Sequence, residues 1–308
     1  MSEYKYTPVC GLFNLGEGPH WKQSNECVYF VDAFVGDVCR FDTKSSEVER
    51  KRVGGTVTII IPWHESEDHF VVSKDHELLQ YEWSTGKTKS LTFVENDLPT
   101  RFNDGKCDRN NRLWIGTMGH ETSPAVVPPE MGSLYCINKD YSVKRRVQNV
   151  SLSNGIAWSP DNKLMYFADS VKREVYVFDY EAETGDVSNQ RTFFDYEKHG
   201  KPDEVPDGMT IDVTGKIWVA NWSGGRLIRL DPETSKIINE VNFEKVSRVT
   251  SLCFGGTQLN KLYVTSSWRG LSDEQRTAQP TAGSLFEVTF PKENIKGFLG
   301  DSFNGNNI

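Results

Sequence analysis

One short apolar motif recurs six times along this chain, and its recurrence strongly limits the possible folds. Each copy has an apolar residue, two variable residues and a second apolar residue, and successive copies start 40 to 58 residues apart. The two apolar positions lie on opposite sides of an extended chain, so both sides of each strand must be buried, as between stacked sheets. The copies are 38–41 (VCRF), 78–81 (LLQY), 134–137 (LYCI), 175–178 (VYVF), 227–230 (LIRL) and 285–288 (LFEV).

A second run, rich in β-branched and aromatic residues, precedes each copy of the motif. These runs occupy 27–32, 69–73, 112–116, 164–169, 216–221 and 261–266. Turn sequences such as SPDN at 159–162 and DPETSK at 231–236 separate the strands. Short strands in about six similar units of roughly 40 to 55 residues indicate an all-β fold, a six-bladed β-propeller. We expect residues 1–308 to form this single domain.

The charge and the composition of the chain limit the classes of molecule that the protein is expected to bind. The 308 residues include 35 Lys and Arg against 43 Asp and Glu, a formal net charge of -8. This balance disfavours nucleic acid and anionic membranes as partners and fits a small-molecule substrate. We also expect the protein to be a monomer. The start of the chain lacks the basic and apolar segments of a leader, and no apolar stretch is long enough to cross a membrane. Six scattered cysteines without a CxxC pair suit a reducing compartment, which predicts a cytoplasmic protein.

Aligning the repeats brings four acidic or amide residues into one register, each followed by glycine. The pairs are Glu17-Gly18, Asp104-Gly105, Asn154-Gly155 and Asp207-Gly208, which lie 10 to 12 residues before the central aromatic residue of the following strand. Innermost strands of a propeller surround a shared channel, so equivalent residues become neighbours in space. Clustered carboxylates repel one another, and an oxygen-bound divalent cation would neutralise them. The alternative is ordinary solvent-facing turns, but four copies in register favour a central metal-binding channel. We expect the glycines to let the backbone turn sharply there.

Several longer motifs resemble one known family over nearly the whole chain. They are GEGPHW at 16–21, RFNDGKCD at 101–108, GTM at 116–118, SNGIAWS at 153–159, PDGMTID at 206–212, GGRLIRLDP at 224–232 and CFGG at 253–256. Their order and spacing resemble the regucalcin, or senescence marker protein, branch of the gluconolactonase family, which includes insect luciferin-regenerating enzymes. The resemblance implies a six-bladed propeller that holds one divalent metal ion and hydrolyses aldonolactones such as glucono-1,5-lactone.

The resemblance also implies roles for particular residues. Glu17, Asn154 and Asp207 match the metal ligands of the family. Its lactone-binding residues correspond to Arg101, Asn103 and Glu121, and 121–130 resembles the loop that folds over the site. Asp104 follows the same register without matching a ligand, so we expect it to support the site from behind or to line the channel.

These residues are suited to metal-assisted hydrolysis of an ester. A divalent ion would polarise the lactone carbonyl and activate a water, and Asp207 would take the water's proton as general base. Oxygen ligands favour calcium, magnesium or manganese, and zinc also binds carboxylates. Two alternatives stay open: a calcium-binding regulatory propeller without significant catalysis, or a related hydrolase acting on luciferin-derived compounds or phosphotriesters. Trp268 lies in a loop where a substrate contact is conceivable.

Overall fold

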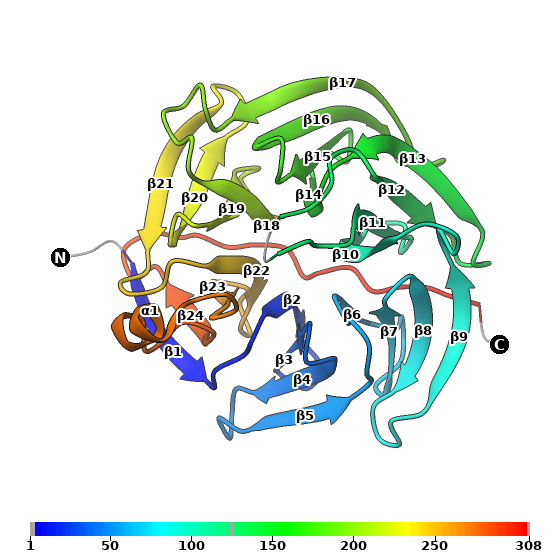
Figure 1. The fold of residues 1–308 in the computed structure, drawn as a ribbon, viewed down its shortest axis with the longest axis horizontal. Coiled ribbons are helices and arrows are strands. Elements are labelled where there is room, and N and C mark those ends of the chain that lie inside the picture. Colours follow the sequence, from blue (N-terminus) through cyan, green and yellow to red (C-terminus); the bar gives the residue numbers. More distant parts are fainter. Residues whose placement is uncertain (1–3, 124–125, 307–308) are drawn as a thin grey trace.

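The computed structural model describes residues 4–123 and 126–306 of the chain. Six antiparallel sheets of four strands each are arranged like blades around a central axis (Figure 1). The predicted all-β, six-bladed propeller is therefore confirmed. The inner edges of neighbouring blades contact one another around the axis, as β2 does with β22 and β14 with β18, where these strands comprise Gly16–Lys22, Val249–Gly255, Ser153–Trp158 and Val205–Ile211.

We number the blades along the chain and give their strands from the axis outward. Blade 1 comprises β2, β3 (Cys27–Asp32), β4 (Asp37–Asp42) and β5 (Val48–Arg52). Blade 2 comprises β6 (Ile60–Pro62), β7 (His69–Lys74), β8 (Glu77–Glu82) and β9 (Thr88–Phe93). Blade 3 comprises β10 (Thr100–Cys107), β11 (Leu113–Gly119), β12 (Gly132–Ile137) and β13 (Val143–Val150).

The second half of the ring repeats this pattern. Blade 4 comprises β14, β15 (Leu164–Asp169), β16 (Glu174–Glu181) and β17 (Asp186–Asp195). Blade 5 comprises β18, β19 (Ile217–Trp222), β20 (Arg226–Asp231) and β21 (Lys236–Asn242). Blade 6 comprises β22, β23 (Lys261–Ser266), β24 (Leu285–Thr289) and β1 (Lys5–Cys10). Because β1 pairs with β24, the start of the chain completes the last blade and closes the ring.

The recurring apolar motif forms the third strand of every blade, and the run before it forms the second. The first and fourth positions of the motif are buried in all six copies, as the alternation predicted. Each of six apolar clusters joins two neighbouring blades, including blades 6 and 1. The cores therefore lie between the blades, which leaves the axis itself available to polar side chains.

The segment after β24 leaves the repeat and crosses one end of the axis (Figure 1). Gly297 pairs with Asp212 of blade 5, Phe303 pairs with Trp63 of blade 2, and the backbone N–H of Asn304 donates to Asn111 of blade 3. A single short helix, α1 (Asp273–Ala278), lies before β24, and no helix of the described ranges has the length and apolar character needed to span a membrane.

Candidate functional site

The four positions that the repeats bring into register all lie on innermost strands at an interruption of the ladder. Pairing shifts between Glu17 and His20 on β2, and the same irregularity occurs on β10, β14 and β18. A bulge leaves residues unpaired and redirects their side chains, so carboxyl and amide groups leave the pleat of the sheet there. The channel therefore receives polar groups from four blades.

The glycines that follow these residues serve close packing more than sharp turning. Only Gly18 among the four has a positive φ, of 54°. A Cβ on Gly155 would lie 2.5 Å from the backbone nitrogen of Met209 on the next blade, and one on Gly208 would lie 2.1 Å from Ser251 Oγ. The expected turning role is thus wrong for most copies, because the physical requirement is the close approach of neighbouring innermost strands.

One cavity of about 440 Å³ opens at the end of the axis opposite the C-terminal segment. It brings together all six residues predicted as metal-binding, catalytic or substrate-binding, from blades 1, 3, 4 and 5. These residues are Glu17, Arg101, Asn103, Glu121, Asn154 and Asp207. Residues separated by up to 190 positions in the sequence therefore face one small volume.

The carboxyl groups at the base of this cavity destabilise each other's charge. Burial and then the negative charge of Asp104 raise the pKa of Asp207 well above its usual range. Burial, Asp207 and Asp104 together raise the pKa of Glu17 in the same way. Asp104 itself does not line the cavity, and its Oδ1 accepts a hydrogen bond of 2.7 Å from the Gly105 N–H. It therefore lies behind the two carboxylates, close enough to act on both.

Asn154 is held by a neighbour that the sequence did not single out. Its Nδ2 donates to Ser170 Oγ at 2.9 Å, and this hydroxyl donates to the backbone oxygen of Pro206 at 2.6 Å. The side chain of Asn154 also hydrogen-bonds to Asp207 and lowers that carboxyl's pKa against the larger effect of burial. With the amide nitrogen engaged, Oδ1 accepts no hydrogen bond from the described residues.

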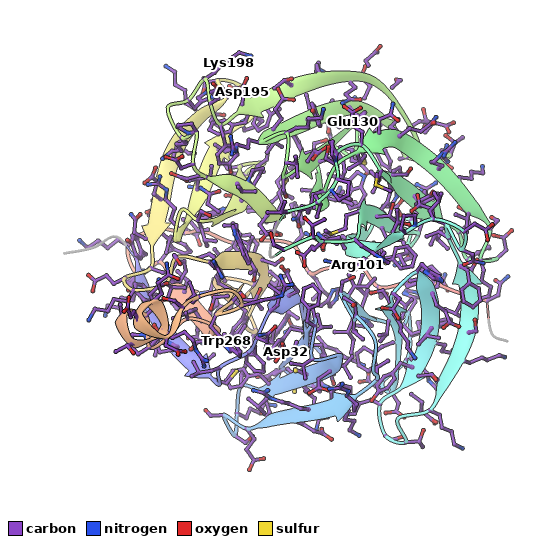
Figure 2. The ribbon with its side chains drawn as sticks, in the orientation of Figure 1. Asp32, Arg101, Glu130, Asp195, Lys198 and Trp268 are labelled. Atoms are coloured by element: carbon purple, nitrogen blue, oxygen red, sulfur yellow. The ribbon has the colours of Figure 1, made fainter. Side chains whose placement is uncertain are left out.

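Arg101 and Asn103 are fixed to each other and to the next blade. Arg101 Nη1 donates to the backbone oxygen of Phe102 at 2.8 Å and to Asn103 Oδ1 at 3.2 Å. Asn103 Nδ2 donates to the Ser153 backbone oxygen at 2.8 Å, which joins β10 to β14. Arg101 is only 7% exposed, and Figure 2 shows it near the centre of the ring. Its planar group is therefore preoriented toward the cavity.

Glu121 makes an ion pair across the mouth of the cavity. Its Oε2 accepts a hydrogen bond of 2.7 Å from Arg269 Nη2, which comes from the loop after β23 in blade 6. The guanidinium of Arg269 lies 3.9 Å from the ring centroid of Phe34 in blade 1, and that of Arg101 lies 5.1 Å from the same centroid. Phe34 thus contacts the guanidinium groups of both Arg269 and Arg101, which lie far apart in the sequence.

The loop expected to cover the site is described only in part. Glu121 and Val126 line the cavity, whereas residues 124–125 lie outside the described ranges. Trp268 does not line this cavity. It borders another hollow beside α1, where the Arg276 guanidinium lies 4.1 Å from its ring centroid. Figure 2 shows Trp268 on the side of the ring where α1 lies.

Sequence reasoning missed Arg269, Phe34 and Ser170. Arg269 follows a strand end and resembles many surface arginines, and Phe34 lies in an ordinary hairpin turn. Ser170 directly follows the second-strand run of blade 4, and that position was the only local signal available. Their roles depend on contacts across the ring, which no spacing along the chain reveals.

The donor set at the base of the cavity is compatible with a hard cation. Among residues 4–123 and 126–306, no group of three or more His, Cys, Asp or Glu side chains is placed to hold a metal ion. The set predicted here has two carboxylates, Glu17 and Asp207, and one amide, Asn154. Two carboxylates whose charges repel and one amide oxygen without a hydrogen bond are the oxygen ligands that calcium and magnesium prefer.

Known proteins resemble this chain over most of its length. Residues 15–268 match the model of the SMP-30/Gluconolactonase/LRE-like region. Regucalcin of Pongo abelii is 38% identical over 291 residues, which cover 94% of this chain and 95% of the relative. A solved luciferin-regenerating enzyme has a TM-score of 0.90 and 35% identity, covering 97% of this chain and 99% of that one. A calcium-binding regucalcin from Agrobacterium tumefaciens, at 24% identity and a TM-score of 0.88, covers 97% of both chains and shares the fold.

Proposed function

Because this chain belongs to the SMP-30/gluconolactonase/LRE-like family, we propose that it hydrolyses sugar lactones of the glucono-1,5-lactone type with one divalent cation. One observation carries the proposal. A single cavity collects the carboxylates of Glu17 and Asp207, the amide of Asn154 and the preoriented Arg101, together with Asn103 and Glu121. The polar groups of these last two residues are able to hydrogen-bond to hydroxyls. Metal binding alone would require only the two carboxylates and the amide.

The cation would be held by Glu17, Asn154 and Asp207. Burial and mutual repulsion make the ionised carboxylates unfavourable without a counter-charge, and this supports a cation as their partner. Asn154 would offer its amide oxygen, since Ser170 engages its nitrogen. When bound, the ion would supply Lewis-acid polarisation of the lactone carbonyl and make a water more acidic.

Asp207 is the proposed general base. Its raised pKa makes the carboxylate a stronger proton acceptor than an exposed aspartate, and the hydrogen bond from Asn154 fixes its orientation. The proton would pass from the attacking water to this carboxylate. Burial of Asp207, which is 5% exposed, limits competing contacts with bulk water.

Arg101, Asn103 and Glu121 would position the lactone. The guanidinium of Arg101 presents donors for ring and carbonyl oxygens, and the carboxylate of Glu121 accepts hydrogen bonds from substrate hydroxyls. Arg269 would hold Glu121 in place through the 2.7 Å contact. Asp104 would act from behind by strengthening the basicity of Asp207.

A second candidate is a calcium-binding propeller without significant catalysis, which the regucalcin relatives and the repelling carboxylates support. The enzyme is favoured because Arg101, Asn103 and Glu121 share the cavity with the ligand set. Hydrolysis of luciferin-derived compounds or phosphotriesters would use the same base and belongs to the substrate tests. The proposal includes a monomer in the cytoplasm, consistent with the six free cysteines.

The decisive experiment measures glucono-1,5-lactone turnover by purified protein across calcium, zinc, manganese and magnesium, with and without a chelator. We expect chelation to abolish turnover and at least one ion to restore it. Tight calcium binding without turnover of any lactone would favour the calcium-binding propeller instead. Turnover that is insensitive to chelation would contradict the role of the cation.

A further inference from the structure

The Glu121–Arg269 ion pair divides the mouth of the cavity. Glu121 follows the second strand of blade 3, and Arg269 follows the second strand of blade 6, which lies opposite in the ring (Figure 1). Phe34 of blade 1 lies against Arg269 and Arg101 on the side of blades 1 and 2. The open part of the mouth therefore lies on the other side of this ion pair, next to blades 4 and 5.

The lining on that side contains four apolar side chains among polar ones such as Ser170, Arg173 and Asp203. We define the apolar wall as the four residues Leu152, Val171, Val205 and Trp222, which belong to blades 4 and 5. Val171 is 40% exposed and lines the cavity, so part of its apolar surface faces the open volume. Contact between an exposed valine and an apolar group of a ligand removes apolar surface from water, which favours binding.

Trp222 gives this wall a fixed surface. Its backbone forms a bridge with Arg248, and the Arg248 guanidinium lies 5.1 Å from the indole centroid. Arg248 Nη2 donates to the backbone oxygen of Gly270 at 3.3 Å, which ties the arginine to blade 6. An aromatic face held in this way offers contact area at little cost in side-chain entropy.

We propose that the substrate of this chain is a lactone with an oxygen-rich edge and an apolar substituent, and that the substituent lies against the apolar wall. The inference rests on the proposed lactonase function and refines its substrate class. With the lactone carbonyl near Asp207 and its oxygens toward Arg101, the ion pair blocks one side of the mouth. A substituent on the ring would then extend toward blades 4 and 5, where Val171 faces the open volume.

The proposal predicts a dependence on chain length. For δ-valerolactones that carry methyl, ethyl, propyl or butyl on the ring carbon bonded to oxygen, kcat/KM should rise about threefold to fourfold for each methylene. Replacing Val171 by Asn should reduce the increment to less than about twofold, because an amide opposes burial of an alkyl chain. Val171→Thr, which keeps the shape and exchanges one methyl for a hydroxyl, should give an intermediate increment.

Val213 provides the matched control, since this valine is 45% exposed and does not line the cavity. Val213→Asn should leave the increment of the wild type unchanged. A flat series in the wild type, or an unchanged increment in both Val171 variants, would overturn the proposal.

A binding measurement separates this inference from the proposed function. The corresponding alkyl δ-valerolactams resist hydrolysis, and their binding can be followed by calorimetry. Affinity that rises with chain length, with an increasingly negative heat-capacity change, supports the wall even if no lactone is turned over. Turnover of the lactones without any dependence on chain length would contradict the role of the apolar wall and would be consistent with the proposed lactonase function. If the protein shows neither lactone turnover nor binding that depends on chain length, both the proposed function and this inference are contradicted.

Discussion

The two ends of the propeller axis are built from the same six innermost strands, yet they provide opposite environments. At one end lies the cavity of about 440 Å³ with its carboxylates and arginines. At the other end, a cavity of about 80 Å³ lies against Phe298, Leu299 and Gly300 of the C-terminal segment.

Charge also distinguishes the ends. At the closed end, burial and the nearby charge of Lys106 lower the pKa of His20 to about 3. Burial lowers the pKa of Lys106 as well. At the open end, burial and mutual repulsion raise the pKa of Glu17 and Asp207. The closed end therefore favours neutral side chains, whereas the open end holds buried acids whose ionised forms are unfavourable without a counter-charge. The two ends of one ring of strands therefore differ in the charge that their buried groups favour.

The largest expected effect tests the open end directly. Asp207→Asn should lower kcat for glucono-1,5-lactone by about a thousandfold, since it removes the proposed base and a cation ligand. The cation-free variant should also be more stable than wild type at neutral pH, because one buried negative charge is gone. Steady-state kinetics and thermal denaturation measure both. Asp301→Asn, at the closed end, should keep full activity; a comparable loss there would contradict the distinction between the ends.

The next effect concerns packing of the closed end. A Cβ on Gly297 would lie 2.0 Å from the ring of Phe254, so Gly297→Ala should cost about 3 kcal/mol of stability through overpacking. Gly200→Ala meets nothing within 4 Å and carries only the strain of its φ of +70°, about 1 kcal/mol. Urea denaturation measures both. Activity per folded molecule should stay unchanged, and a fall in kcat for Gly297→Ala would show that the two ends are coupled.

A smaller effect is expected at the rim of the open end. Arg269→Lys keeps the charge but loses the planar group that contacts Glu121 and Phe34, so KM for a hydroxylated lactone should rise about tenfold with little change in kcat. Arg276, whose guanidinium lies 4.1 Å from the Trp268 ring centroid, supplies the control Arg276→Lys. Equal kinetics for the two variants would show that Arg269 does not position Glu121.

The smallest effect is a change in the pH dependence of Tm. Glu17 and Asp207 have raised pKa values in the folded protein, so the cation-free fold should lose stability as pH rises from their ordinary values of 4.5 and 3.8 through the raised ones. His20 acts oppositely: its stabilisation is complete above 6.5 and is lost as pH falls toward about 3. Tm measured against pH with a chelator, and again with calcium, should show the first loss only without calcium.

Asp301 contributes to the same loss of stability with rising pH, since burial raises its pKa from 3.8 to about 6. Asp301→Asn removes this contribution and isolates that of the open end. If calcium leaves the pH dependence of this variant unchanged, the carboxylates of Glu17 and Asp207 do not bind the ion.

The apolar motif, repeated six times with a strand run before each copy, was sufficient to predict the fold. The six copies of the motif became the third strands of six blades, and both of their apolar positions are buried. The Glu17, Asn154 and Asp207 register correctly predicted side chains on innermost strands, because equivalent repeat positions become neighbours in a closed ring. The turning role expected of the glycines was wrong for all but Gly18. The sequence did not reveal the close approach of Gly208 to Ser251, because Ser251 belongs to a strand of another repeat.

Sequence by itself determined the period of the strands, the ring they form and the chemical type of the groups at its centre, since these follow from local alternation and repetition. Only the tertiary structure decided which end of the axis is open, how Arg269 reaches Glu121, and where the apolar wall lies. These features come from segments outside the repeat, whose partners lie across the ring. Contacts of that kind depend on the three-dimensional path of the loops, and no periodicity along the chain encodes them.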